Sequence, residues 1–175
     1  MSEYNLRKAH QNDRETIWQI LLDAICRRRN EGSRQWQDGY PNIDTVETDL
    51  KDGVGYVLER DDEIAGYAAI IFDIEPAYEN LEGKWLNEDS YVVVHRVAVS
   101  EKFIGKGLAT KLFEMIETVA KSENMFSIKV DTNFDNFAML KILDKLNYTY
   151  CGEVYFRGSA RKAFQKILGS RLKNP

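Results

Sequence analysis

Apolar positions recur with the period of an α-helix in three segments of the chain. The first runs from Asp13, which stands where an N-cap residue belongs, to about Arg28. The second follows Gly107 and extends to about Ser122, and the third follows Asn136. The apolar faces consist of Ile17, Ile20, Leu21, Ala24 and Ile25; of Leu108, Leu112, Met115, Ile116 and Val119; and of Met139, Ile142, Leu143 and Leu146. The pattern predicts three amphipathic helices.

Runs rich in β-branched and aromatic residues predict the strands. Residues 54–58 and 64–72 flank the charged stretch 59–63 and predict an antiparallel hairpin. Residues 91–99, YVVVHRVAV, form a nearly continuous apolar run, which predicts a central strand buried on both faces. Further strands are predicted at 126–130, 148–156 and 160–167.

The predicted elements follow one another as helix, hairpin, strand, helix, strand, helix, strand, strand. This order is typical of an α/β protein, and we expect a three-layer α/β/α arrangement around a mixed sheet. The 175 residues contain no internal repeat and no domain-splitting linker. We therefore expect one domain over residues 1–175.

Composition and charge narrow the classes of partner. Hydrophobic residues make up 43% and charged residues 30%, as in an ordinary globular protein. A net charge of −4 argues against nucleic acid as the main partner. The polar start MSEYNLRKAH and the lack of a run of about 18 apolar residues argue against a membrane protein and predict a cytoplasmic location. Cys26 and Cys151 lie in no metal-binding spacing, so neither a metal nor a disulfide is expected.

The join between the strand 91–99 and the following helix carries the clearest chemical pattern. Gly105 and Gly107 allow the backbone to approach a ligand closely and to turn its N–H groups toward it. The start of a helix adds unpaired amides and the positive end of the helix dipole. The join therefore predicts a backbone cradle for a pyrophosphate, and a tight strand-to-helix turn is the structural alternative.

Two other phosphate-binding loops do not fit this join. A P-loop requires a Gly-Lys-Ser/Thr triplet, which does not follow Gly105. A dinucleotide fingerprint requires a third small residue where Thr110 stands, and an early βαβ unit where a hairpin is predicted.

At this point the chain resembles the GNAT superfamily of N-acetyltransferases, whose acetyl-CoA signature is Arg/Gln-x-x-Gly-x-Gly/Ala after a β-branched strand. Gly107 and Ala109 match the last two signature positions, and Ile104 stands where Arg or Gln is expected. The segment from Asn136 to Tyr148 is similar to the family's Asn-x-x-Ala…Leu-Tyr-x-Lys-x-Gly-Phe segment.

The resemblance implies that the chain binds acetyl-CoA as a co-substrate. The pantetheine arm would lie in a gap beside the central strand, hydrogen-bonded to the backbone of Val97, Ala98 and Val99. The Asn136 side chain would touch the arm. The amides that would hold the pyrophosphate belong to Ile104, Gly105, Lys106, Gly107, Leu108, Ala109 and Thr110.

The resemblance also implies direct transfer of the acetyl group to a primary amine, without a covalent enzyme intermediate. His95 is our candidate for the base, because histidine titrates near neutral pH. A histidine that only shapes the cleft is the alternative. Glu88, together with Asp89, is the next candidate and would act through a water.

A proton must also reach the departing thiolate. The family often supplies it from a tyrosine at the position that Leu143 occupies here. Another hydroxyl or a water must then serve. The candidate hydroxyls are Tyr148, Tyr150 and Tyr155, of which we choose Tyr150.

Three aromatic residues lie in the irregular segments 31–42 and 75–90, where the family keeps its acceptor-binding elements. Trp36, Tyr40 and Trp85 are predicted to line a pocket for a small amine or a peptide amine. Lids over the core are the alternative. A non-catalytic acyl-CoA-binding or regulatory module is the rival function, which Leu143 favours. A homodimer formed by pairing of sheet edges is compatible with either function.

Overall fold

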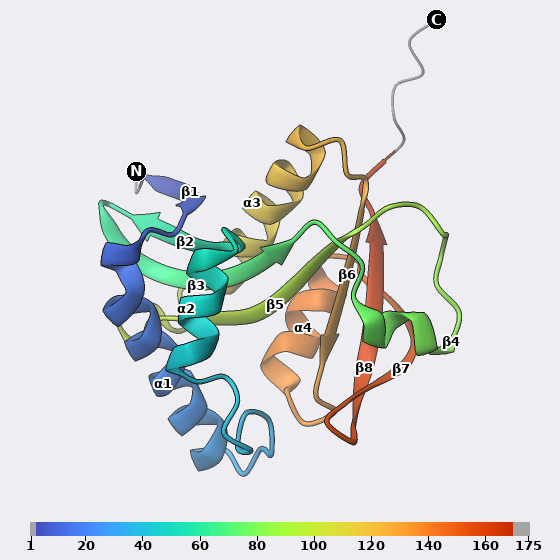
Figure 1. Cartoon of the computed structure of the whole chain (residues 1–175), viewed down its shortest axis with the longest axis horizontal. Coiled ribbons are helices and arrows are strands. Elements are labelled where there is room, and N and C mark those ends of the chain that lie inside the picture. The colour runs from blue at the N-terminus through green and yellow to red at the C-terminus, as the bar shows by residue number, and fades with distance from the viewer. Residues whose placement is uncertain (1–2, 170–175) are drawn as a thin grey trace, which may run out of the picture. The chain divides into compact units, whose positions relative to one another are not determined.

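The computed structural model describes residues 3–169 (Figure 1), which form two compact units. The first unit consists of the residues up to Ile70 and of His95–Met115. The second unit consists of Ile71–Val94 and of the residues from Ile116 onward. Strand β5, Val92–Val99, and helix α3, Leu108–Ser122, each contribute residues to both units. The single domain expected over residues 1–175 stays a prediction.

The first unit is built on an antiparallel meander. Strands β1, β2 and β3 pair in sequence order, with Tyr4 opposite Arg60 and Gly55 opposite Ala69. Asp61 and Asp62 both have left-handed φ angles, 51° and 63°, which suits a two-residue hairpin turn. The elements of this unit are β1 (Tyr4–Lys8), η1 (Gln11–Asp13), α1 (Arg14–Asn30), α2 (Ile43–Lys51), β2 (Gly55–Arg60), β3 (Glu63–Ile71) and η3 (Glu101–Phe103), with parts of β5 and α3.

Helices cover both faces of this meander. The Tyr67 side chain in β3 packs with α1 and α2 in one core cluster. Its neighbour Gly66 faces the other way, where a Cβ would lie 3.8 Å from Leu112 of α3. Alternate residues of a strand point to opposite faces, so the first unit has three layers. This arrangement confirms the α/β/α layering expected from the sequence.

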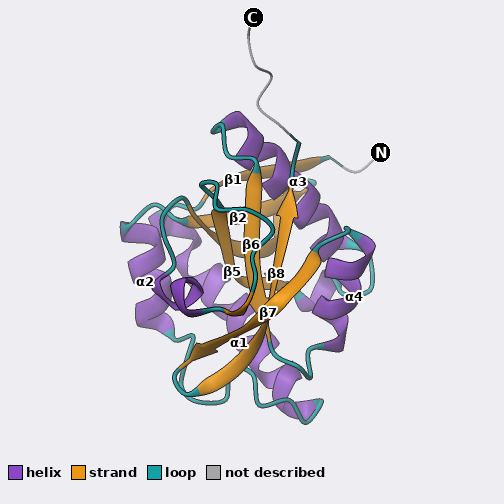
Figure 2. Cartoon of the chain, turned by 90° about the vertical axis from the view of Figure 1, so that its right-hand side faces the viewer, coloured by secondary structure: helices purple, strands orange, loops and turns teal. Residues whose placement is uncertain are grey.

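The second unit contains the remaining strands, of which β6 and β8 run side by side in Figure 2. The start of β5 pairs in parallel with β6, and β6, β8 and β7 pair antiparallel in that order. Because β5 is common to both units, the hydrogen-bonded order is β1-β2-β3-β5-β6-β8-β7-β4, a mixed sheet as expected. The other elements of the second unit are η2 (Pro76–Asn80), β4 (Glu82–Gly83), β6 (Ser127–Thr132), α4 (Phe137–Lys145), β7 (Thr149–Phe156) and β8 (Ser159–Ile167).

Strand β1, helix α2 and the two-residue strand β4 were absent from the sequence-based prediction, as were the short 3-10 helices η1, η2 and η3. Strand β1 lies in the polar start of the chain, and helix α2 has only nine residues. Asn42 caps α2 by accepting a hydrogen bond from the Thr45 amide at 3.0 Å. Asp13, the predicted cap of α1, instead accepts from the His10 amide and pairs with Arg7.

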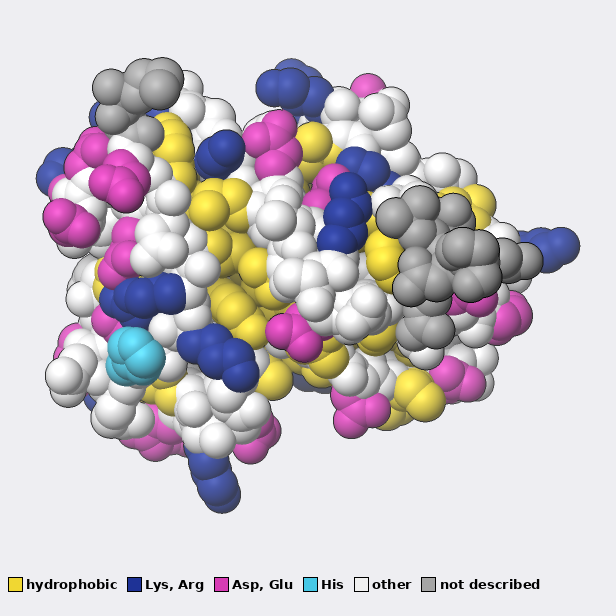
Figure 3. Space-filling model, turned by 90° about the horizontal axis from the view of Figure 1, so that it is seen from above, with side chains coloured by type: hydrophobic (Ala, Val, Ile, Leu, Met, Phe, Trp, Pro, Cys, Tyr) yellow, Lys and Arg dark blue, Asp and Glu magenta, His cyan; other side chains and the backbone are white. Residues whose placement is uncertain are grey.

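The sequence predicts no membrane span, no metal site, no disulfide and no nucleic-acid partner. Residues 3–169 contain no helix long and apolar enough to cross a membrane, and no group of three or more His, Cys, Asp or Glu side chains placed to hold a metal ion. Cys26 and Cys151 are free thiols. On the face shown in Figure 3, basic side chains are scattered among acidic ones and form no continuous stripe.

Adjacent leucines on α1 test the core of the first unit. Leu21 is fully buried, whereas Leu22 is 36% exposed. We expect Leu21→Ala to lower the free energy of unfolding by about 2–5 kcal/mol, and Leu22→Ala to lower it by less than about 1 kcal/mol. Urea unfolding measures both values. Equal losses for the two variants would contradict this packing.

Candidate active site

The pairing of β5 with β6 stops halfway along β5. Three parallel pairs join the two strands, and the last of them is Val94 with Val130. Strand β5 nevertheless continues to Val99, and the described register pairs none of its later residues with β6. The backbone edge of Val97–Val99 is therefore available to an extended ligand, which can bind an unpaired strand edge as an added strand does.

The burial of β5 changes at the same point. Val92, Val93 and Val94 are buried, as a central strand requires. Of the five later residues only Ala98 is buried, and the others are partly buried. The expectation that the whole strand is buried on both faces was therefore wrong for its second half.

Arg96 gives β5 a local distortion at the start of this edge. Its φ angle is 54°, in the left-handed region that a residue with a Cβ rarely adopts. The conformation costs on the order of 1–2 kcal/mol and persists only where surrounding contacts hold it.

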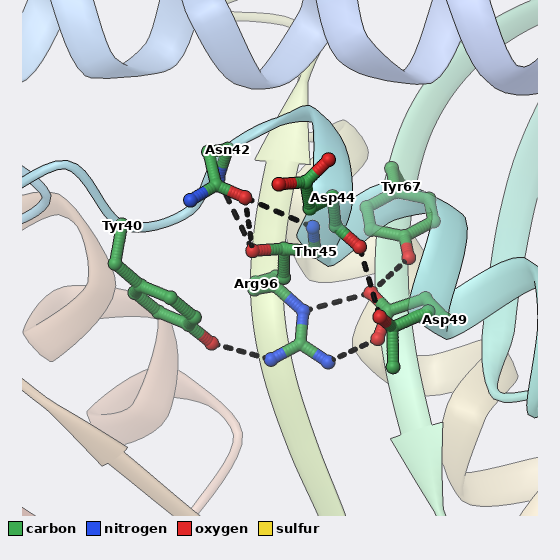
Figure 4. A network of polar contacts seen from close by, with 8 residues as sticks. Tyr40, Asn42, Asp44, Thr45, Asp49, Tyr67 and Arg96 are labelled. Atoms are coloured by element: carbon green, nitrogen blue, oxygen red, sulfur yellow. Dashed lines mark hydrogen bonds and ion pairs between the residues drawn. The ribbon is translucent and has the colours of Figure 1, made fainter.

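A buried ion pair holds the Arg96 side chain. Its Nε and Nη2 donate to the two carboxylate oxygens of Asp49 on α2, at 2.8 and 2.6 Å (Figure 4). Both side chains are less than a tenth exposed. A guanidinium matches a carboxylate in this two-bond geometry, so the pair fixes the guanidinium in both position and plane.

Two tyrosines complete this network, as Figure 4 shows. The Tyr67 hydroxyl donates to Asp49 at 2.5 Å, and Arg96 Nη1 donates to the Tyr40 hydroxyl at 2.5 Å. Burial, together with the Asp49 charge, raises the pKa of Tyr67, so that its phenol remains protonated. Through Arg96, the loop that contains Tyr40 is tied to the β5 backbone.

The cradle predicted after β5 is open. Gly105 and Gly107 have φ angles of 75° and 74°, and a Cβ added to either would meet no atom within 4 Å. The backbone hydrogen bonds of this segment include Ile104 N–H to Glu101 O and Lys111 N–H to Gly107 O. Within residues 3–169, the amides of Gly105, Lys106 and Gly107 are not among the donors. These amides are available for a ligand.

Helix α3 begins at Leu108, directly after these glycines. Its first residues therefore include Ala109 and Thr110, whose amides have no partner within the helix. Lys106 lies nearby and donates to the Lys102 carbonyl at 3.1 Å, which keeps its positive charge beside the loop. Such an arrangement suits an anion at the start of the helix.

The other predicted residues of the first unit have different surroundings. His95 is half-exposed and precedes Arg96 in β5. Trp36, which also has a left-handed φ of 63°, packs against the core cluster of the first unit, as the lid alternative requires. Tyr40 belongs to the Arg96 network. The structure thus brings Tyr40, but not Trp36, into polar contact with β5.

Asn136 and Tyr150 lie in the second unit. The Asn136 side chain caps α4 by accepting from the Met139 amide at 3.2 Å. Tyr150 is 51% exposed, and its ring meets that of Phe164 edge-on, with centroids 5.7 Å apart. Their predicted roles toward the pantetheine arm and the leaving thiolate stay predictions.

The structure also describes the alternative catalytic groups. Burial raises the pKa of Tyr148, which makes its phenol a poorer proton donor. Tyr155 donates to Glu82 at 3.0 Å. Burial likewise raises the pKa of Cys151, which disfavours its thiolate and hence an acyl-enzyme at this thiol.

Glu88 and Trp85 come together in the second unit. Both line a cavity of about 420 Å³, along with Asp89 and Lys129. Trp85 is 9% exposed and belongs to the core cluster of this unit, so it serves as both core and cavity wall.

Sequence reasoning missed the Arg96–Asp49 pair and Lys129. A signal existed for each, because Arg96 lies in a strand that is otherwise largely apolar, and Lys129 lies between the apolar strand residues Ile128 and Val130. Unpaired charges in such positions are costly, so each of the two requires a partner or a function.

Comparisons with known proteins show the family of this chain. The family model "Acetyltransferase (GNAT) family" matches residues 14–148. A GNAT-family acetyltransferase of known structure from Streptococcus agalactiae is 35% identical, with 95% of this chain and 96% of that chain covered and a TM-score of 0.87. YesJ of Bacillus subtilis, an uncharacterized N-acetyltransferase, is 25% identical over 142 residues, 80% of this chain and 78% of YesJ.

The structure of YncA, a putative acetyltransferase of Salmonella typhimurium solved with acetyl-CoA, has a TM-score of 0.66 at 18% identity, with 97% and 96% of the two chains covered. At that identity the likeness concerns the fold alone. The family match and the Streptococcus agalactiae relative show that this chain belongs to the GNAT acetyltransferase family. The resemblance noted in the sequence is thereby confirmed.

The buried pair offers a test of what holds β5. Asp49→Ala leaves the Arg96 guanidinium buried without its counter-charge, and we expect a loss of about 3–5 kcal/mol in the free energy of unfolding. Glu63→Ala removes the exposed pair with Lys102 and serves as the control, with a loss below about 1 kcal/mol. Chemical unfolding measures both. A loss for Asp49→Ala no larger than that of the control would contradict the role of the pair.

Proposed function

We propose that this protein is an N-acetyltransferase that moves the acetyl group of acetyl-CoA to a primary amine by direct nucleophilic attack. The proposal rests on two open backbone features of the first unit that follow one another along the chain. The β5 edge at Val97–Val99 lacks a β6 partner, and the open amides at Gly105–Gly107 follow it directly. A long ligand with a polar arm and a diphosphate matches this order.

The residues present fit acetyl-CoA. The Val97–Val99 backbone would bind the pantetheine arm as an added strand. The amides from Gly105 to Thr110 would hold the pyrophosphate at the helix start. Ile104 is 41% exposed and brings no charge where the family signature has Arg or Gln, so binding at this position would depend on the backbone.

The transfer itself requires few side chains. The neutral amine attacks the thioester carbonyl carbon, the new C–N bond forms, the C–S bond breaks, and the sulfur leaves as a thiolate. A strand amide at Val97 or Val99 would stabilise the oxyanion. His95, or Glu88 through a water, would take the amine proton, and Tyr150 or a water would protonate the thiolate.

A second function, a non-catalytic acyl-CoA-binding or regulatory module, is favoured by one observation. Leu143 is fully buried and stands where the family often has its tyrosine acid, so this position offers no hydroxyl. The two functions differ in turnover. Steady release of free thiol from acetyl-CoA in the presence of a panel of amines supports the enzyme, and binding without thiol release supports the module.

Gly107→Asp tests the cradle. The substitution places a side chain and a negative charge where a pyrophosphate would lie, and we expect acetyl-CoA affinity to fall about 100-fold or more, roughly 2.7 kcal/mol. Gly53→Asp is the matched control. Gly53 also has a left-handed φ, 68°, and open space around its Cβ, so both variants suffer similar backbone strain. Calorimetric titration gives the affinities, and equal affinities for the two variants would refute the cradle.

His95→Ala tests the base. We expect a fall in kcat near neutral pH with acetyl-CoA affinity nearly unchanged, because the imidazole would act on the amine proton and not on the bound thioester. His10→Ala, at the exposed histidine of the first unit, is the control and should keep the parent rate. If the rate and its pH profile are the same in His95→Ala as in the parent, histidine is not the base.

A further inference from the structure

The cavity in the second unit has a floor that is unusual for a protein core. Strand β6 reads Ser-Ile-Lys-Val-Asp-Thr, and alternate residues place Ser127, Lys129 and Asp131 on one face. Ser127 accepts from the buried Gln165 side chain at 2.8 Å, and Asp131 accepts from the Tyr78 hydroxyl at 2.6 Å. The middle residue of this polar row, Lys129, is only 3% exposed and lines the cavity.

Two aromatic rings flank the Lys129 ammonium. Its Nζ lies 4.1 Å from the centre of the Trp85 ring and 3.8 Å from that of Tyr91. Within residues 3–169 it has neither an ion-pair partner nor a hydrogen-bond acceptor. Aromatic faces offset part of the cost of burying a cation, but ring faces offer its three N–H donors no lone-pair acceptor. Burial accordingly lowers the pKa of Lys129, and the nearby charges of Glu88 and Glu79 oppose that shift.

The wall of the cavity is fixed by hydrogen bonds and not only by packing. The Trp85 indole N–H donates to the Tyr78 carbonyl at 3.1 Å. The fully buried Gln165 side chain accepts from the Leu86 amide at 2.7 Å and donates to Asn87 at 2.9 Å. These bonds hold the 85–87 segment against β8 and restrict the wall of the cavity. A restricted site loses less entropy on binding.

The charge changes sign between the floor and the rim. Glu79, Glu88 and Asp89 line the cavity and are exposed, as is Lys84, so the rim carries a net negative charge, whereas Lys129 lies at its buried end. A purely anionic ligand would meet the rim carboxylates, and a purely cationic one would meet the Lys129 ammonium. A molecule with an anion at one end and a cation at the other avoids both repulsions.

We propose that this cavity binds a small amino-carboxylate, with its carboxylate on the Lys129 ammonium and its own ammonium among the rim carboxylates of Glu79 and Glu88. The carboxylate supplies the acceptor that the Lys129 N–H groups lack, and the aromatic rings cover the aliphatic part of the ligand. A volume of about 420 Å³ accommodates a molecule of amino-acid size. This binding does not depend on acetyl transfer, so it stands or falls separately from the proposed function.

The test is calorimetric titration of the full chain, without acetyl-CoA, against a series of amino-carboxylates from glycine to 6-aminohexanoate. The carboxylates from acetate to hexanoate and the corresponding amines serve as half-molecule probes. We expect one or more amino-carboxylates to bind about tenfold or more tightly than either half-molecule. Absence of binding across the series, or equal binding of a half-molecule, would overturn the proposal.

Lys129→Met removes the charge while keeping the length of the side chain. We expect the variant to fold and to lose the affinity for the amino-carboxylate about tenfold or more. Lys162→Met is the matched control, because Lys162 is also a strand cation near aromatic rings, Phe134 and Tyr150, but does not line the cavity. If Lys129 had only a structural role, Lys129→Met would change the unfolding midpoint and leave the affinity for the amino-carboxylate unchanged. That result would refute the site.

The rim gives an independent readout. Glu79→Gln and Glu88→Gln remove negative charge without changing shape, and each should reduce the preference for the amino-carboxylate over the simple carboxylate. An unchanged preference in both variants would contradict the proposed orientation of the ligand, even if Lys129→Met abolished binding.

Discussion

The Arg96–Asp49 ion pair is the interaction on which the shape of β5 depends. An arginine in a left-handed conformation interrupts the regular strand, and the strand keeps this conformation because its guanidinium is bound on two sides by one buried carboxylate. Tyr67 and Tyr40 add hydrogen bonds to the same two groups. The distortion lies between the last residue paired with β6, Val94, and the open edge that begins at Val97.

Beyond this point the chain offers a ligand its backbone more than its side chains. The open edge of β5 and the amides around Gly105 and Gly107 are main-chain groups, and their positions depend on strand pairing and on two left-handed glycines. Side chains such as Ile104 can then vary without removing the cradle. The second unit contrasts with this arrangement, because its cavity places a buried side-chain charge, Lys129, at the centre of the recognition we propose.

Much of the fold could be predicted from the sequence, because periodic apolar faces and β-branched runs report directly on burial. The helix after Gly107 and the strand before it were predicted within about a residue of their observed bounds. Helix α2 was missed because nine residues carry few apolar positions, and β1 because its residues are polar and only partly buried. The β2–β3 hairpin was predicted because a charged turn separates two apolar runs.

The site could be predicted only where it depends on local sequence. Two glycines at a strand-to-helix join indicate a left-handed backbone, and both Gly105 and Gly107 have left-handed φ angles in the structure. The pair of Arg96 with Asp49 joins residues 47 positions apart, and no periodicity reveals such a partner. The surroundings of Lys129 likewise require Trp85 and Tyr91 to be brought over β6 by a segment without regular spacing.

The central claim is that main-chain amides of the first unit grip acetyl-CoA. Nuclear magnetic resonance of the ¹⁵N-labelled protein during titration with acetyl-CoA tests it most directly. The account predicts the largest amide shifts at Val97, Val99, Gly105 and Gly107, with Gly53, a left-handed glycine of the same unit outside the cradle, unchanged. Saturable binding that leaves the amides of Gly105 and Gly107 unshifted would contradict the account.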